Sequence, residues 1–292
     1  MFYFCLMESG NHFCFNGKIL LTGKLIISAD NRCFRFGDGF FETMKMVDEN
    51  IALYKYHFER LFSSLQLLKF ETPDYFTAEY LLNQIKIITK KNNHTKAARI
   101  RLTIFRGNGG LFDYENNFAN YTIQTWQLDP AIALNKKGLI TGIYTKARKA
   151  IDDFSHIKSN NYLPSVMAAM WSKENKLDDA IILNTNNRLA EATIANIFLM
   201  KDGKVKTPSL SEGCVNGVMR KYVIECLKKE NIPFEETKVE ADELAEASEL
   251  FTTNAIQEIK WVQKCNKFNY GREFSKYLHH TFIQSLHKHI SE

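Results

Sequence analysis

The chain has 292 residues, of which 45% are hydrophobic and 24% charged, and its net charge is +5. This composition is normal for a soluble globular protein with enough length for one large domain or two ordinary ones. Because acidic and basic residues are interspersed, without a long basic run, we expect no nucleic-acid partner. No apolar run reaches the roughly 18 residues that a membrane span needs, so we expect no membrane partner.

The first half of the chain alternates short strands with two helices. Strands are expected at residues 2–6, 12–21 and 42–54, the last as a strand pair around a turn at 48–50. Residues 57–70 and 77–90 are expected to be helices, because apolar residues recur in them at three- and four-residue spacing. Further strands are expected at 98–106, where apolar and polar residues alternate, and at 121–128.

The second half begins after a candidate linker at residues 129–135. We therefore expect an N-terminal α/β domain at 1–128 and a C-terminal α/β domain at 136–292. Its expected strands are at 140–144, 179–183, 194–200, 234–239 and 249–253, and its expected helices are at 165–176, 217–229, 243–247 and 274–290.

The cysteines and histidines do not indicate a metal site. The six cysteines are scattered, without metal-ligand spacing, and predict reduced thiols of a cytoplasmic protein. The apolar stretch Met1–Met7 lacks a basic segment, so a signal peptide is not expected. Four histidines of the C-terminal helix have no fixed acidic partner and indicate a solvated helical face: His279, His280, His287 and His289.

Lys158 is the candidate for chemistry. It lies in a polar stretch just before Leu163-Pro164, which opens a predicted helix. A lysine at a strand-to-helix junction can be partly desolvated, which lowers its pKa and makes its amine nucleophilic toward carbonyl compounds. A solvated lysine is the ordinary alternative, so the prediction depends on other residues.

Four further features agree with a reactive lysine. Glu191 precedes an apolar strand, where a buried carboxylate would need a cationic partner such as a protonated ring nitrogen. The loop 213–220 opens a helix, whose free backbone N–H groups suit a phosphate. The hydroxyl-rich turn Thr252–Ala255 and the cation of Arg60 could bind the same phosphate. Together they indicate a pyridoxal 5'-phosphate site.

The order of these motifs resembles the class IV aminotransferase family of fold-type IV pyridoxal phosphate enzymes. This family includes branched-chain aminotransferases, D-amino acid aminotransferases and aminodeoxychorismate lyase. The resemblance is carried by Phe36–Thr43, His57–Leu61, Arg106–Gly110, Ile157–Tyr162, Ala190–Phe198, Val215–Arg220 and Thr252–Ala255. It implies a mixed α/β, two-domain D-amino acid aminotransferase-like fold with the cofactor between the domains, and a homodimer.

The resemblance also implies roles for single residues. Lys158 would form the Schiff base and carry the proton, and Glu191 would pair with the pyridine nitrogen. The remaining cofactor-binding residues would be Arg60, Tyr162, the backbone of Val218 and Met219, and the turn Thr253–Asn254. The residues expected to select the substrate are Phe34, Phe36, Arg101, Arg106 and Ala255.

The reaction remains open between two members of the family. Phe41-Glu42-Thr43 looks more like the aminotransferases. Arg99–Arg101 loosely resembles the carboxylate-binding strand of the branched-chain members, which act with 2-oxoglutarate, but lacks the tyrosine of that strand. The loops 106–110 and 215–220 and the turn Thr253–Ala255 look more like the lyase, which releases pyruvate and 4-aminobenzoate from 4-amino-4-deoxychorismate. Leu111-Phe112, however, stands where the lyase usually has a basic residue.

Three other readings are less favoured than the aminotransferase. No Arg-x-His sequence follows Arg106, which disfavours D-amino acids. No Lys-Ser/Thr follows Gly107–Gly110, which disfavours a nucleotide-binding loop. A non-catalytic pyridoxal phosphate binder would not need Lys158 and Glu191 together.

Overall fold

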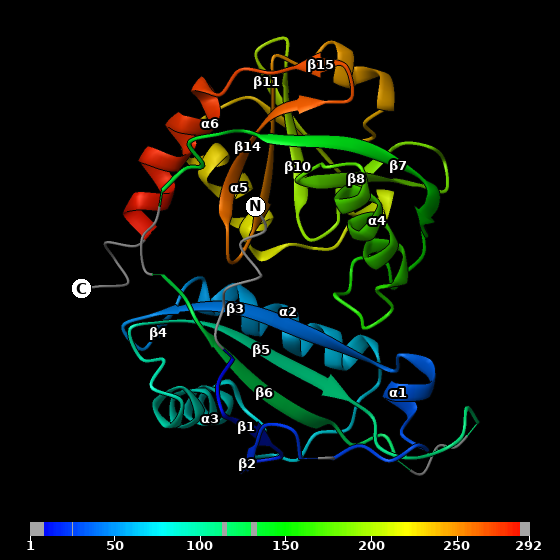
Figure 1. Ribbon diagram of the computed structural model, residues 1–292, viewed down its shortest axis with the longest axis vertical. Helices are drawn as coiled ribbons and strands as arrows, with labels where there is room; N and C mark the ends of the chain where they lie inside the picture. Colours follow the sequence, from blue (N-terminus) through cyan, green and yellow to red (C-terminus); the bar gives the residue numbers. More distant parts are fainter. Residues whose placement is uncertain (1–8, 25, 113–115, 130–132, 287–292) are drawn as a thin grey trace. The chain divides into compact units, whose positions relative to one another are not determined.

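The structure is a computed structural model that describes residues 9–24, 26–112, 116–129 and 133–286. These residues form two compact units (Figure 1). The first unit contains the described residues up to 129 together with Lys158–Asn161, and the second contains residues 133–157 and 162–286. The segment that carries Lys158 therefore packs with residues far earlier in the chain.

The first unit is a sheet in the order β2-β1-β6-β5-β3-β4 with helices. Its strands are β1 (His12–Phe15), β2 (Lys18–Leu21), β3 (Gly39–Val47), β4 (Asn50–Ile51), β5 (Ala97–Phe105) and β6 (Asn120–Gln127). Its helices are α1 (Arg32–Phe36), α2 (Tyr54–Leu67) and α3 (Ala78–Lys91).

The two faces of this sheet differ in character. On β5, Ile100, Leu102 and Ile104 are fully buried, whereas the residues between them are only partly buried. In the antiparallel register, Glu42 lies opposite Leu102, so it shares the buried face. Helices α2 and α3 pack against the strands on that face, and Arg101 belongs to the other face. The alternation predicted for residues 98–106 is confirmed.

The second unit contains a nine-stranded sheet in the order β12-β11-β10-β13-β14-β7-β8-β9, with β15 paired to β14. Its strands are β7 (Leu139–Lys149), β8 (Asp179–Asn184), β9 (Leu189–Ala192), β10 (Asn196–Lys201), β11 (Lys204–Pro208), β12 (Phe234–Thr237), β13 (Glu249–Asn254), β14 (Glu258–Cys265) and β15 (Phe268–Asn269). Its helices are α4 (Leu163–Glu174), η2 (Leu210–Glu212), α5 (Val218–Lys229), η3 (Ala241–Ala245), α6 (Glu273–Leu278) and η4 (His279–Ile283).

Strands β10 and β13 are antiparallel neighbours in this sheet. The rings of Phe198 and Phe251 face each other in register and stack, with centroids 5.0 Å apart. Two residues further along the same face, Asn196 lies opposite Thr253. Helix α5 packs against β13, and its first turn, which begins at Val218, contains a buried Met219. The polar side chains of Asn196 and Thr253 therefore lie next to the stacked rings of Phe198 and Phe251.

Most predicted elements are present, and the differences have physical causes. No strand was expected at β14, because its charged and apolar residues are mixed; it becomes a central strand between β13 and β7. Helix α1 was also missed, since it is only five residues long and is defined by the Asn31 cap rather than by apolar spacing. The strand expected at 2–6 lies outside the described residues.

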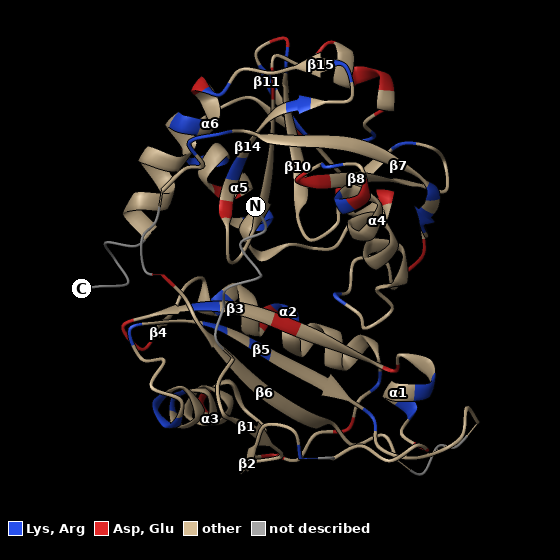
Figure 2. Ribbon diagram, viewed as in Figure 1, with Lys and Arg blue, Asp and Glu red and all other residues tan. Residues whose placement is uncertain are grey.

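The positions of the charged residues along the chain agree with the mixed charge of the sequence. Figure 2 shows basic and acidic residues interspersed over both units. The cysteines of the described residues form no disulfide with one another: Cys14, Cys33, Cys214, Cys226 and Cys265. Among the residues with described positions, no helix combines the length and apolar character needed to cross a membrane.

Candidate active site

Lys158 is held at the edge of β3 by main-chain contacts. The N–H of Phe41 donates to the carbonyl of Lys158 at 3.0 Å, and the N–H of Asn160 donates to the carbonyl of Gly39 at 2.9 Å. A Cβ atom on Gly39 would lie 2.4 Å from the carbonyl oxygen of Ile104. The same Cβ would lie 2.7 Å from Nδ2 of Asn160, so glycine at position 39 lets the lysine segment approach the strand this closely.

The side chain of Phe41 brings two cationic groups together. The Nζ atom of Lys158 lies 4.7 Å from the centre of its ring. The guanidinium carbon of Arg101 lies 3.7 Å from the same centre. An amine that can attack a carbonyl carbon and a guanidinium that can bind a carboxylate therefore flank one aromatic ring.

Beside this segment, α2 presents His57 and Arg60 to Glu42 of β3. The carboxylate accepts hydrogen bonds from Nε of Arg60 at 2.7 Å, from Nη2 of Arg60 at 2.6 Å and from Nδ1 of His57 at 2.7 Å. Burial by itself would raise the pKa of Glu42, but Arg60 and His57 outweigh it and lower the pKa to about 2. Burial lowers the pKa of His57, so the imidazole is neutral and donates from Nδ1.

Glu191 lies in the second unit, within the short strand β9, and is 3% exposed. The N–H of Val215 donates to its Oε2 at 2.8 Å. The Nζ atom of Lys149 lies 2.8 Å from Oε1, but not in hydrogen-bonding geometry. In the described part of the chain, Oε1 thus has an ionic neighbour and no hydrogen-bond donor. The sequence analysis missed Lys149, because its pairing with Glu191 arises only from the sheet.

The predicted phosphate-binding groups gather at the start of α5. The cap residue is Gly217, which has no side chain that could accept from the N–H groups of the first turn, where Val218 and Met219 lie. A Cβ on Gly217 would lie 1.9 Å from Oδ1 of Asn196, so a side chain here would displace the Asn196 amide from its hydrogen bond to the carbonyl of Val215. The buried Oγ1 of Thr253 has no hydrogen-bond partner among the described residues. These groups can bind an anion.

The loop before α5 is fixed by a buried ion pair. Arg188 donates from Nε and Nη2 to both oxygens of Glu212, at 2.6 and 3.0 Å. Asn184 also donates to Glu212, at 2.8 Å. Three residues after Glu212, the N–H of Val215 donates to Glu191.

Two further predicted cofactor-binding residues, Tyr162 and Asn254, lie at the start of a helix and in a turn. Tyr162 is the N-cap residue of α4. The side chain of Asn254 accepts hydrogen bonds from the N–H groups of Ile256 and Gln257, which closes the turn that contains Ala255.

The predicted substrate residues Phe34, Phe36 and Arg106 lie in the first unit. Phe34 and Phe36 lie on α1 with exposed side chains. Arg106 donates to Asp38 at 2.7 Å, to Asn117 at 3.1 Å and to the carbonyls of Leu68 and Lys69. These contacts tie Arg106 to Asp38 and to main-chain carbonyls, whereas Arg101 contacts the ring of Phe41, which Lys158 also approaches.

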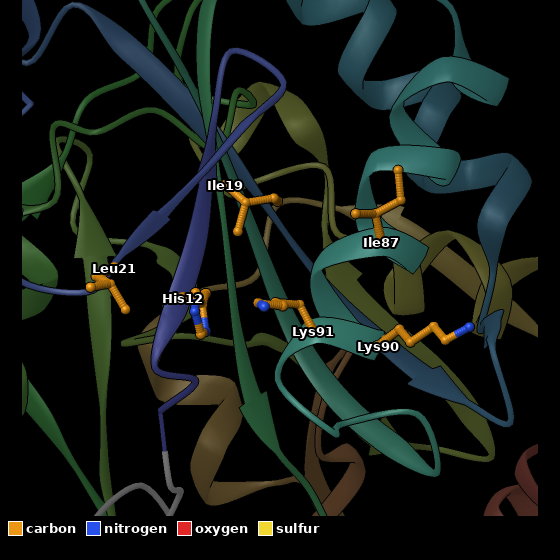
Figure 3. A pocket seen from close by; sticks show the side chains of 6 residues that line it. All are labelled: His12, Ile19, Leu21, Ile87, Lys90 and Lys91. Atoms are coloured by element: carbon orange, nitrogen blue, oxygen red, sulfur yellow. The ribbon is translucent and has the colours of Figure 1, made fainter.

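A separate open hollow of about 840 Å³ lies on the first unit, beside β1, β2 and α3 (Figure 3). In this view Lys91 extends toward His12, whereas Lys90 points away. The lining residues are His12, Ile19, Leu21, Ile87, Lys90 and Lys91. None of them is a predicted site residue, so this hollow is distinct from the groups described above.

Comparison with known proteins gives three consistent results. The model of the family described as amino-transferase class IV matches residues 39–265. A putative branched-chain-amino-acid aminotransferase of Methanocaldococcus jannaschii is 30% identical over 83% of this chain and 85% of its own length. The aminodeoxychorismate lyase of Bacillus subtilis is 27% identical, over 88% of each chain.

A solved structure agrees with the fold. The T.th. branched-chain amino acid aminotransferase with pyridoxamine 5'-phosphate has a TM-score of 0.83 and is 22% identical, covering 96% of this chain and 95% of its own. The mixed α/β fold expected from the sequence is therefore confirmed.

Proposed function

Because the chain belongs to the amino-transferase class IV family of pyridoxal phosphate-dependent enzymes, we propose that it is an aminotransferase acting on a branched-chain-type amino acid and 2-oxoglutarate. Family membership makes it an enzyme with pyridoxal phosphate as cofactor. The choice of reaction and of substrate is our proposal, together with a homodimer in the cytoplasm.

The described residues fit this cofactor at two places. Oε1 of Glu191 is buried without a hydrogen-bond donor, which suits a protonated ring nitrogen. Thr253 Oγ1 is also buried without a partner, and with the first turn of α5 it suits a phosphate. When bound, the cofactor supplies an electron sink for negative charge at the substrate's α-carbon.

Each residue then has a defined task. The ε-amino group of Lys158 is the covalent attachment point, and after release it removes the proton from the substrate's α-carbon. Glu191, held by Val215 and Lys149, keeps the ring nitrogen protonated. Arg60, Val218, Met219, Thr253 and Asn254 bind the phosphate in this proposal, and Tyr162 donates a hydrogen bond to the phenolic oxygen.

The observation that carries the choice of reaction is the pairing of Lys158 and Arg101 around Phe41. An amino or keto acid carries its carboxylate one bond away from the reacting carbon. A guanidinium that contacts the same ring as the reactive amine can bind such a carboxylate while Lys158 acts at the α-carbon. In this proposal Arg101 binds substrate carboxylates, and Phe34, Phe36, Arg106 and Ala255 act in substrate selection.

The competing reaction is the lyase, which is favoured by the similarity to the Bacillus subtilis lyase over 88% of the chain. Both reactions begin with proton removal by Lys158, so the cofactor residues do not separate them. A two-arm assay on one preparation does. One arm supplies Leu, Ile, Val or D-Ala with 2-oxoglutarate, and the other supplies aminodeoxychorismate and follows pyruvate. Pyruvate release without amino transfer would refute the proposal.

A further inference from the structure

Glu42 makes contacts that the proposed reaction does not use. It lies in β3, is 1% exposed, and faces α2 rather than Lys158. Both of its oxygens are engaged by Arg60, one through Nε and the other through Nη2, and the second oxygen also accepts from His57. This fork-on-fork arrangement fixes the plane of the guanidinium as well as its position.

Stability alone gives little reason to retain this cluster. An apolar pair of similar volume is often as stable as a buried ion pair, although removing only one partner of such a pair is costly. The Glu42 charge also cancels that of Arg60, so the pair attracts an anion less strongly than Arg60 alone would. What the pair does supply is a fixed orientation of the donors of Arg60.

We propose that Glu42 is a positioning residue that orients Arg60 toward the cofactor phosphate, and that His57 holds Glu42 in place. This inference rests on the proposed function, in which Arg60 binds that phosphate. His57 is 1% exposed and three residues before Arg60 on α2, so the helix presents both side chains to the same carboxylate. The neutral imidazole fills the acceptor capacity of Glu42 without adding a second positive charge.

The alternative, that only net charge matters, predicts the opposite sign. If charge alone governed phosphate binding, Glu42→Gln would leave Arg60 uncompensated and strengthen binding. If the orientation of Arg60 governs phosphate binding, the NH2 group of the new Gln would face an N–H group of Arg60 and could not accept from it. The two-point contact would then be lost, and phosphate binding would weaken. Hydrogen bonds to charged groups are strong enough for their misalignment to weaken binding about tenfold or more.

The experiment compares pyridoxal phosphate with pyridoxal, which lacks the phosphate. The dissociation constant of each is measured from the covalent absorption band in the wild type and in Glu42→Gln, Arg60→Ala and the double variant. Glu249→Gln is the matched control, because it removes a buried carboxylate that contacts Phe274 and Ser275 instead. The readout is the ratio of the two dissociation constants, which a general loss of stability would leave unchanged.

We expect Glu42→Gln to lower the preference for pyridoxal phosphate about tenfold or more, with pyridoxal binding unchanged. The control should keep the wild-type ratio, and Glu42→Gln should have no further effect in the Arg60→Ala background. The inference would be overturned if Glu42→Gln left the preference for pyridoxal phosphate unchanged or increased it. It would also be overturned if Glu42→Gln lowered this preference equally in the Arg60→Ala background. If Glu42→Gln does not fold, Glu42→Asp, which keeps the charge but shortens the reach, gives the same comparison.

Failure of the underlying function would look different. A wild-type protein with no covalent band for either aldehyde would refute the proposed function itself. A normal wild-type band, combined with an unchanged ratio in the Glu42 variants, would refute only the positioning role of Glu42.

Discussion

Replacing Lys149 by Met tests the ion pair that orients Glu191. In the folded protein Glu191 is 3% exposed, and the change would remove the cation that lies 2.8 Å from its carboxylate, leaving only the Val215 N–H as its partner among the described residues. Removing one partner of a buried pair costs about 3–5 kcal/mol. Because the side chain of Lys149 is 16% exposed, water can replace part of the lost interaction. We therefore expect the free energy of unfolding to fall by about 2–3 kcal/mol.

Urea unfolding without added cofactor measures this change. The matched control is Lys204→Met, because Lys204 and its partner Glu235 are both 42% exposed and such pairs contribute about 0–1 kcal/mol. Adding Glu191→Gln to Lys149→Met should restore most of the loss, since no uncompensated charge is then buried. The reasoning would be refuted if Lys149→Met matched the control, or if the two changes were additive.

Three further outcomes are expected. Lys158→Ala should abolish the covalent band that borohydride reduces; a band that persists would place the attachment elsewhere. Gly217→Ala should destabilise the protein by about 2 kcal/mol and weaken phosphate binding, because its Cβ would meet Asn196; thermal melts and phosphate titration check this. The pKa of Glu42 falls from 4.5 to about 2, so its stabilisation, roughly 3 kcal/mol, is complete above pH 4.5 and is lost toward pH 2. Acid unfolding followed by circular dichroism should be less steep in this range for Glu42→Gln than for the wild type.

Local patterns were sufficient for part of the fold. The spacing of Phe58, Leu61 and Leu65 predicted a helix that the structure has as α2, although it begins at Tyr54. The alternation around Ile100 and Leu102 predicted β5 and its buried face. Both patterns follow from the geometry of one element, so they can be read without knowing its neighbours.

Contacts between elements could not be read in this way. β14 has no clean periodicity, because it is flanked by strands on both sides and part of its length is exposed. The partner of Glu191 was expected to be a cofactor alone, whereas the sheet also brings Lys149 to it. Arg106 was expected to select the substrate, and the structure shows it bound to Asp38 and main-chain carbonyls; its role in substrate selection stays a prediction.

The sequence by itself determined the family, the cofactor and the residues proposed for it, because motifs such as Ile157–Tyr162 keep reactive groups at fixed spacing along the chain. Only the tertiary structure decided which groups support them. The Lys158 segment is positioned by main-chain hydrogen bonds to β3, and Arg60 donates hydrogen bonds to Glu42 of that same strand. Such contacts depend on strand register and helix packing, which join residues distant in sequence and leave no periodic signal in it.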